Sequence, residues 1–160
     1  MNKVVSLGTL VRLRQNLRRR KKTVVFTNGT FDILHRGHVE YLSKARALGD
    51  VLIVGLNSDA SIRRIKGQGR PINPASDRAA VLAALGSVDY VCFFGEETPH
   101  RLISRLVPDI LVKGADWRMG NIVGREVVEH SGGTVKRIHL TPGRSTTNTI
   151  KRILRAYCTK

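Results

Sequence analysis

Short runs of β-branched and aromatic residues alternate along this chain with stretches whose apolar residues recur at helical spacing. Runs of this kind, bounded by turn residues, are typical of strands. We expect them at 23–27, 51–56, 88–94, 109–113 and 135–140. Strands that alternate with helices build a parallel sheet with helices on both faces. The predicted fold class is therefore α/β, with a doubly wound five-stranded parallel sheet.

The first run leads into a helix through a loop that contains two histidines. Asn28 and Gly29 end the predicted strand, because both residues tolerate turn conformations. After His38 the chain switches to helical spacing. One face of the expected helix holds Val39, Leu42, Ala45 and Leu48. His35 and His38 therefore stand at the entrance of a helix, about one turn apart.

The entrance of a helix is a favourable place for an anion. Its first backbone N–H groups have no partner within the helix, and the helix dipole adds about half a positive charge there. A phosphate is stabilised by both effects. Gly37 lets a phosphate approach the backbone, and two imidazoles suit the charge that develops during phosphoryl or nucleotidyl transfer. We therefore predict phosphate chemistry at His35 and His38.

Two other interpretations of the histidine pair remain open. The spacing His-x-x-His places two metal ligands on one helix face, but a zinc site needs a third or fourth ligand. The chain has neither a Cys pair nor a His-Glu-x-x-His pattern to supply one. The histidines could also only cap the helix. Phosphate chemistry is favoured because the other loops agree with it.

Polar segments follow three more of the predicted strands. A glycine-containing loop after the second strand carries Lys66 and Arg70, which are natural phosphate ligands on a loop able to close over a substrate. Asp116 follows the fourth strand and could bind a ribose hydroxyl, a nucleobase amine or a metal. Ser145 and Thr146 offer a second helix entrance to phosphate. Each segment also has a simpler interpretation. The loop with Lys66 and Arg70 could be an exposed basic loop, Asp116 could only form a turn, and Ser145 could only cap a helix.

The predicted topology gives these segments a common location. In parallel sheets, ligands bind beyond the carboxyl ends of the strands, at a switch in strand order. Right-handed crossovers bring the loops that follow the strands to the same edge of the sheet. Neither a Walker A pattern nor a G-x-G-x-x-G fingerprint occurs in the chain. The expected site is therefore neither a P-loop nor a standard dinucleotide fold.

An excess of basic residues, 28 against 12 acidic ones, gives the 160-residue chain a net charge of +16. Such a field favours anionic partners without identifying them. Positive charge is densest at 18–22, where an amphipathic N-terminal helix should end. This cluster is either the favourable basic end of that helix or a binding patch. We expect a single domain over 1–160, with the basic helical segment 1–22 packed on it.

Several other classes of protein fit the sequence poorly. No apolar run is long enough to span a bilayer and no signal-peptide pattern occurs, so we expect a cytoplasmic protein without membrane contact. Cys92 and Cys158 form no spaced motif. The few aromatic residues lie mostly inside predicted strands or helices, and zinc-finger and RNP-type motifs are absent. A basic nucleic-acid-binding protein is therefore the weaker alternative.

Four segments together resemble a known family. The stretch Gly29-Thr-Phe-Asp-Ile-Leu-His-Arg-Gly-His38 resembles the signature of the H-x-G-H nucleotidyltransferases, and Ser145-Thr-Thr resembles their second motif. The segments Lys66-Gly-Gln-Gly-Arg-Pro-Ile72 and Leu111-Val-Lys-Gly-Ala-Asp-Trp117 resemble the D-glycero-β-D-manno-heptose 1-phosphate adenylyltransferase family, which makes ADP-heptose for lipopolysaccharide. The resemblance implies a Rossmann-like nucleotidyltransferase fold. The sugar-kinase half often fused to such a domain does not occur in this sequence, so we expect a separate kinase.

The resemblance also implies a reaction: transfer of AMP from ATP to the heptose 1-phosphate, with release of pyrophosphate and with Mg²⁺. It implies no protein ligand set for a metal, and we expect a homodimer. Cytidylyltransfer, or FAD-type adenylyltransfer to another phosphorylated acceptor, stays open. The roles that the resemblance implies are catalysis for His35, His38 and Lys66, nucleotide binding for Gly29, Thr30, Phe31, Gly37, Asp116, Ser145 and Thr146, and acceptor binding for Asn28, Asp32 and Arg70.

Overall fold

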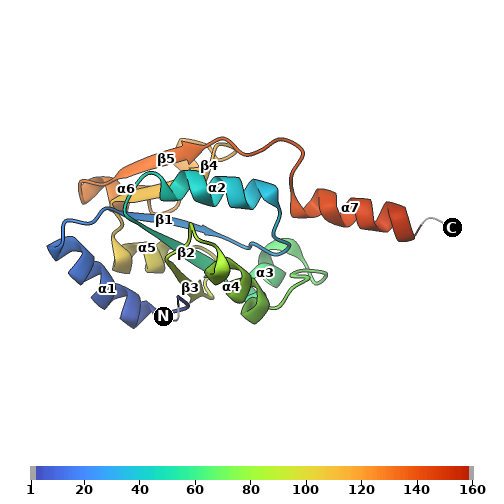
Figure 1. Ribbon diagram of the computed structural model, residues 1–160, viewed down its shortest axis with the longest axis horizontal. Coiled ribbons are helices and arrows are strands. Elements are labelled where there is room, and N and C mark those ends of the chain that lie inside the picture. The colour runs from blue at the N-terminus through green and yellow to red at the C-terminus, as the bar shows by residue number, and fades with distance from the viewer. Residues whose placement is uncertain (1–2, 159–160) are drawn as a thin grey trace.

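The computed structural model describes residues 3–158, and its centre is a parallel sheet (Figure 1). The strands lie in the order β3-β2-β1-β4-β5, and every neighbouring pair is parallel. The predicted α/β class with a five-stranded parallel sheet is therefore confirmed. The strands are β1 (Val24–Gly29), β2 (Val51–Asn57), β3 (Tyr90–Phe94), β4 (Ile110–Gly114) and β5 (Thr134–Ile138).

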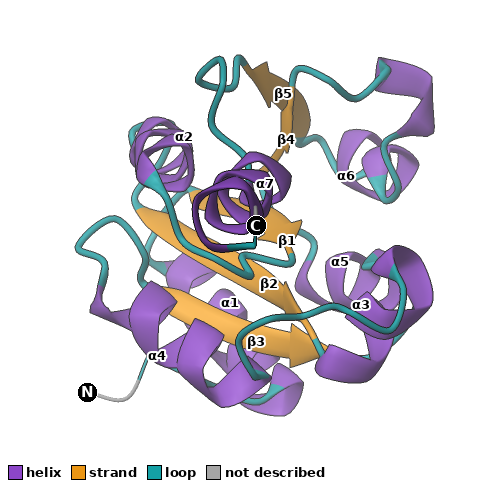
Figure 2. Cartoon of the chain, turned by 90° about the vertical axis from the view of Figure 1, so that its right-hand side faces the viewer, coloured by secondary structure: helices purple, strands orange, loops and turns teal. Residues whose placement is uncertain are grey.

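Helices cover both faces of the sheet, which makes the fold doubly wound (Figure 2). One face packs against α2 (Arg36–Arg46) and α4 (Ala75–Ala84). The other face packs against α1 (Leu7–Arg19), α5 (His100–Leu106) and α6 (Arg125–His130). The remaining elements are α3 (Asp59–Lys66), the short 3-10 helix η1 (Met119–Asn121) and α7 (Thr146–Tyr157).

The central strands supply both layers of the core, because successive side chains of a strand point to opposite faces. On β1, Val25 packs with Leu42 and Leu82 on the face covered by α2 and α4. The next residue, Phe26, packs with Leu102 on the opposite face. All five side chains are buried. The apolar runs of the sequence are thus explained by burial on two sides.

The strand order reverses between β1 and β4, which are neighbours in the sheet although they are far apart along the chain. Ligands of open parallel sheets bind beyond the carboxyl ends of the strands at such a switch point. The loops that follow β1, β2, β4 and β5 meet at this edge, and α7 starts there (Figure 2). The fold therefore assembles the polar segments that the sequence distributes over more than 100 residues.

The segment after β2 differs from the sequence-based expectation. Lys66 was expected on a flexible loop, but it is the last residue of α3. Ser58 caps this helix by accepting a hydrogen bond from the backbone N–H of Ser61 at 3.2 Å, and Gly67 ends it with φ 93°. With Ile62 as its single buried apolar residue, α3 leaves too weak a periodic pattern to be detected.

The buried face of α2 is also shifted from the predicted one. Val39 and Leu48 are 39% and 37% exposed, and α2 ends before Leu48. Tyr41 takes part in the core instead, together with Leu42 and Ala45. The Tyr41 hydroxyl is hydrogen-bonded to that of Thr27 at 2.8 Å, so this aromatic residue can be buried at a position that a purely apolar pattern does not mark.

The two terminal helices are held very differently. α1 buries Leu10 and Arg14, and the Arg14 guanidinium pairs with Asp109 at 2.7 Å. α7 projects away from the sheet, and none of its residues is buried (Figure 1). Within residues 3–158, no helix has the length and apolar character that crossing a membrane requires.

Candidate active site

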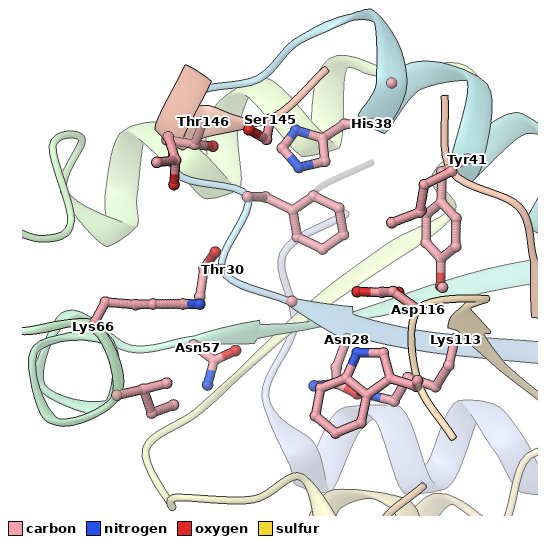
Figure 3. A pocket seen from close by; sticks show the side chains of 18 of the residues that line it. Asn28, Thr30, His38, Tyr41, Asn57, Lys66, Lys113, Asp116, Ser145 and Thr146 are labelled. Atoms are coloured by element: carbon pink, nitrogen blue, oxygen red, sulfur yellow. The ribbon is translucent and has the colours of Figure 1, made fainter. Parts of the chain in front are cut away.

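A cavity of about 580 Å³ opens at the carboxyl edge of the sheet. Its wall combines the ends of β1, β2 and β4 with the first turns of α2 and α7 (Figure 3). Every residue that the sequence proposes for the site lines this cavity, with the exception of Asp32. The expected meeting of the strand-end loops is therefore found in the structure, whereas the role of each residue stays a prediction.

His35 stands at the entrance of α2 and forms its N-cap. Its Nδ1 accepts a hydrogen bond from the backbone N–H of His38 at 3.4 Å. An imidazole nitrogen that accepts carries no proton, so a neutral His35 holds its proton on Nε2. The capping interpretation is thus correct for His35 and does not exclude a role in the cavity. His35 caps the helix with one nitrogen and offers the other as a donor.

The two imidazoles stack face to face, with ring centroids 3.8 Å apart and an angle of 16° between the rings. The pKa of His38 is lowered to about 4, mainly because the ring is buried and to a smaller extent because of electrostatic repulsion from His35. Burial also lowers the pKa of His35, and the nearby Arg144 adds to this effect. At neutral pH both rings are therefore uncharged. The Nδ1 atom of His38 is buried and has no hydrogen-bond partner among the described residues.

The backbone around the histidines is closely packed. A Cβ at Gly37 would lie 3.1 Å from Cβ of Arg144 and 3.2 Å from the His35 ring, so a side chain there would displace one of them. Phe31 adopts φ 43°, in the left-handed region that residues with side chains rarely occupy. Its ring meets the edge of His38 at a centroid distance of 5.1 Å. Strained backbone of this kind clusters at functional sites.

The entrance of α7 faces this region from the carboxyl-terminal part of the chain. Ser145 caps α7 by accepting a hydrogen bond from the N–H of Asn148 at 3.1 Å. Thr146 donates its hydroxyl proton to the carbonyl of Ile33 at 3.5 Å. The Thr141 hydroxyl donates to the Glu40 carboxylate on α2. Two helix N-termini therefore meet at one cavity, and each adds free N–H groups and positive potential.

The β2 side of the cavity is cationic. Lys66 and Arg70 both line the wall. The Arg70 guanidinium pairs at 2.5 Å with Asp32, whose side chain is fully buried. Asp32 also accepts hydrogen bonds from the backbone N–H groups of Ile72 and Asn73, at 2.8 and 3.0 Å. Asp32 thus lies behind the wall, where it orients Arg70 and does not reach a ligand itself.

Arg78 is buried next to the same wall and connects several loops through its guanidinium group. Its guanidinium donates to the carbonyls of Thr30 and Asn57, at 2.7 and 2.9 Å. It also pairs with Asp59 at 2.7 Å. Arg78 therefore ties the loop after β1 to the loop after β2. Its buried position identifies it as a structural residue behind the cavity.

The β4 side combines a lysine, a carboxylate and an indole. The Lys113 ammonium donates to Oδ1 of Asn28 and lies 5.4 Å from the centroid of the Trp117 ring. Asp116 accepts no hydrogen bond from the described residues, and its carboxylate faces the same space (Figure 3). The sequence-based site list misses Lys113 and Trp117, and it also misses Tyr41. For Lys113 and Trp117, their position at the end of a predicted strand was the available signal, whereas Tyr41 lies within α2 and had no such signal.

The residues of the cavity fit a metal ion only in a limited way. The described chain holds no group of three or more His, Cys, Asp or Glu side chains that could bind a metal. The zinc alternative thus lacks further ligands there. Glu97 and Asp116 are the carboxylates of the wall. Mg²⁺ in nucleotide sites uses one or two carboxylates together with phosphates and water. The cavity therefore suits Mg²⁺ that arrives with a triphosphate.

A parallel α/β sheet with two helix N-termini and paired imidazoles at its switch point provides a site suited to a phosphate-bearing ligand. Comparison with known proteins specifies the class. The model of the cytidylyltransferase-like family matches residues 26–152, which include the whole cavity and all of the sheet except the first two residues of β1. The chain therefore belongs to the cytidylyltransferase-like family and is a nucleotidyltransferase.

Among curated proteins, the chain is similar to the bifunctional protein HldE of several bacteria. It is 58% identical to that of Syntrophotalea carbinolica, over 92% of this chain and 31% of the relative. It is 54% identical to that of Geobacter sulfurreducens, over 97% of this chain and 32% of the relative. The chain thus spans about a third of the length of these relatives.

Solved structures show the same fold. A lipopolysaccharide core biosynthesis protein from Thermoplasma volcanium is 30% identical, with a TM-score of 0.62 over 75% of this chain and 97% of that one. The pantoate-beta-alanine ligase of Francisella tularensis, solved in complex with beta-gamma ATP and beta-alanine, is 15% identical. Its TM-score is 0.63 over 97% of this chain and 80% of the ligase chain, which supports the Rossmann-like fold alone.

Proposed function

We propose that this chain transfers AMP from ATP to D-glycero-β-D-manno-heptose 1-phosphate and releases ADP-heptose and pyrophosphate. A phosphate oxygen of the sugar phosphate attacks the α-phosphorus of ATP. The bond from that phosphorus to the oxygen bridging to the β-phosphorus breaks, and this oxygen leaves with pyrophosphate. The relatives named HldE and the lipopolysaccharide core biosynthesis protein of Thermoplasma volcanium support a reaction in the heptose pathway of lipopolysaccharide synthesis.

The observation that carries the proposal is the meeting of the α2 and α7 entrances around His35 and His38. A sugar phosphate is already a nucleophile, so the enzyme needs no nucleophilic side chain and no strong base. Imidazoles with a lowered pKa fit this requirement, since each neutral ring can donate its N–H to a phosphate oxygen and is only a weak base. Catalysis then consists of positioning and of stabilising the charge that develops on the phosphates.

The two sides of the cavity differ in charge and in aromatic character, which supports a separate position for each substrate. Lys66 and Arg70 make the β2 side cationic, as a phosphorylated acceptor or the leaving pyrophosphate requires. Asp116 and Trp117 on the β4 side offer a carboxylate and an aromatic face, which suit a nucleoside. His35 and His38 lie between these sides, where the α- and β-phosphates would be. Ser145 and Thr146 would hold the leaving group at the α7 entrance.

Pocket residues could hold a magnesium ion that enters with ATP. Glu97 would be its protein ligand, and the ion would neutralise charge on the triphosphate. The cytoplasm, where ATP and phosphorylated sugars are available, is the expected compartment. The homodimer and the absence of a nucleic-acid partner stay predictions, which sedimentation and a salt-dependent binding assay would check.

Pyrophosphate release with a panel of acceptors tests the function. ATP and CTP should each be combined with heptose 1-phosphate, glycerol 3-phosphate and flavin mononucleotide. We expect release only with ATP and the sugar 1-phosphate. Release with CTP and glycerol 3-phosphate would instead favour the cytidylyltransferase alternative, which the family model also accommodates. Release with flavin mononucleotide would favour FAD formation.

A further inference from the structure

The proposed reaction leaves Lys113 unexplained, although it is one of the few buried cationic residues of the described chain. Its exposed fraction is 7%, and it stands at the carboxyl end of β4 beside the strand switch point. A buried ammonium is costly unless it is paired with a carboxylate or is well hydrogen-bonded. No carboxylate lies within ion-pair distance of Lys113 in residues 3–158. Its recorded partners are the neutral Asn28 and the face of Trp117.

The hydrogen-bonding capacity of Lys113 is incompletely used. An ammonium group has three N–H donors, and the structure records one hydrogen bond from Nζ, to Oδ1 of Asn28. Lys113 lines the cavity, so its remaining donors can reach a ligand there. Burial lowers the pKa of Lys113 to about 8, and Asp116 opposes this effect. The side chain is therefore still mostly protonated at neutral pH and can donate.

Asp116 and Trp117 complete the surroundings of Lys113. The Asp116 carboxylate has no hydrogen-bond partner in the described chain and can act as an acceptor only. Trp117 is 47% exposed and lines the cavity. A donor, an acceptor and an aromatic face are the three features that recognise a nucleobase. Of these three features, a phosphate would use the donor alone, and the Asp116 carboxylate would repel it.

We propose that Lys113 and Asp116 form a donor–acceptor pair that reads the amine-bearing edge of the base of the nucleotide substrate, while Trp117 covers the base. This inference rests on the proposed nucleotidyl transfer and names the base specificity of its site. Adenine and cytosine each place an exocyclic amine next to a ring nitrogen that accepts. Asp116 accepts from the amine, and Lys113 donates to the ring nitrogen. Guanine and uracil present a carbonyl oxygen at that place, which Asp116 repels.

Trp117 provides a direct assay, because it is the single tryptophan of the chain. Quenching of its fluorescence by ATP, CTP, GTP and UTP measures affinity without any acceptor sugar. We expect ATP to bind at least about 10-fold more tightly than GTP. In Lys113→Met, which keeps the length of the side chain, ATP should bind roughly 10- to 100-fold more weakly, as expected for a lost charged hydrogen bond. Inorganic tripolyphosphate, measured by calorimetry, should bind both proteins equally well.

The control variant is Lys136→Met, which alters an exposed lysine of β5 outside the cavity and should leave all affinities unchanged. If Lys113→Met fails to fold, Lys113→Arg takes its place in the assay. This variant keeps the charge and the N–H donors and should therefore retain most of the ATP affinity. Asp116→Asn, at an exposed position, should reduce the preference of ATP over GTP by about 10-fold, because its amide also donates.

Three results would overturn the inference. Equally weakened binding of ATP and tripolyphosphate to Lys113→Met would make Lys113 a phosphate ligand. Unchanged ATP binding to that variant, or an unchanged preference of Asp116→Asn for ATP over GTP, would also contradict it. The proposed function fails separately. If the wild-type chain prefers ATP over GTP in the fluorescence assay but releases no pyrophosphate with any sugar phosphate, the base site stands and the heptose reaction does not.

Discussion

The two helix entrances of the cavity differ in how the rest of the molecule supports them. α2 buries Gly37, Tyr41, Leu42 and Ala45 against the sheet, and its first turn is packed between His35 and Arg144. α7 buries nothing, and long hydrogen bonds, such as that from Thr146 to Ile33 at 3.5 Å, hold its first turn. The α2 half of the site is therefore preformed by the core, whereas the α7 half depends on local polar contacts.

This difference has a consequence for catalysis. Regions with few buried apolar contacts open at low free energy, and ligand-binding segments are typically drawn from them. A triphosphate that contacts both helix entrances binds more tightly when α7 is ordered. Its binding therefore increases the fraction of molecules in which α7 is ordered. In the proposed reaction, the well-packed α2 entrance would hold the transferred phosphate, and the weakly packed α7 entrance would hold the leaving group. Variants on the two sides should therefore fail in different ways.

The largest effect should come from Asp32→Ala on the rigid side. The change leaves the Arg70 guanidinium without its carboxylate and two backbone N–H groups without an acceptor. Breaking a buried ion pair in this way typically costs about 3–5 kcal/mol. We expect a loss of this size in the free energy of unfolding by urea, together with a raised KM for the acceptor. Glu129→Gln, in an exposed ion pair on α6, should cost under about 0.5 kcal/mol.

His38→Ala should leave the fold intact and slow the chemistry. Loss of one donor to the transition state typically reduces kcat roughly 100- to 1000-fold. The effect on ATP affinity should be much smaller, because the helix N-termini remain. Pyrophosphate release measures kcat, and Trp117 fluorescence measures binding. His130→Ala, on exposed α6 outside the cavity, should behave like the wild type. Near-normal turnover of His38→Ala would remove His38 from the mechanism.

The stacked histidines also predict how stability depends on pH. The pKa of His38 is about 4 in the folded protein and about 6.5 in an unfolded chain. As pH falls below 6.5, His38 becomes protonated in the unfolded chain but stays neutral in the folded protein. Stability contributed by His38 is therefore complete above pH 6.5 and is lost between 6.5 and 4, by up to about 1.4 kcal/mol per pH unit. Urea unfolding of wild type and His38→Gln at pH 7.5, 6 and 5 should show a flatter profile for the variant; identical profiles would contradict the prediction.

The same contrast explains which parts of the site the sequence could predict. His35, His38 and Ser145 were found because capping and motif residues are adjacent in the chain, so local rules apply to them. The Asp32–Arg70 pair joins positions 38 residues apart, and no spacing rule anticipates it. Lys113 lies inside a predicted strand, and its burial depends on its register beside Asn28 on β1. Tertiary pairing of this kind is decided by the sheet, not by the local pattern.

Ser145→Ala should have the smallest effect and the most local one. Removing a serine N-cap costs about 1 kcal/mol of helix stability. Because α7 buries no residue, this cost should appear as faster amide exchange within α7, while the urea midpoint of the domain stays unchanged. The weaker entrance should raise the KM for ATP several-fold, since the triphosphate must then order α7 at greater cost. Ser131→Ala, beyond the end of α6, is the matched control. If Ser145→Ala instead lowers the urea midpoint as Asp32→Ala does, α7 unfolds together with the core, and the two halves of the site are not independent.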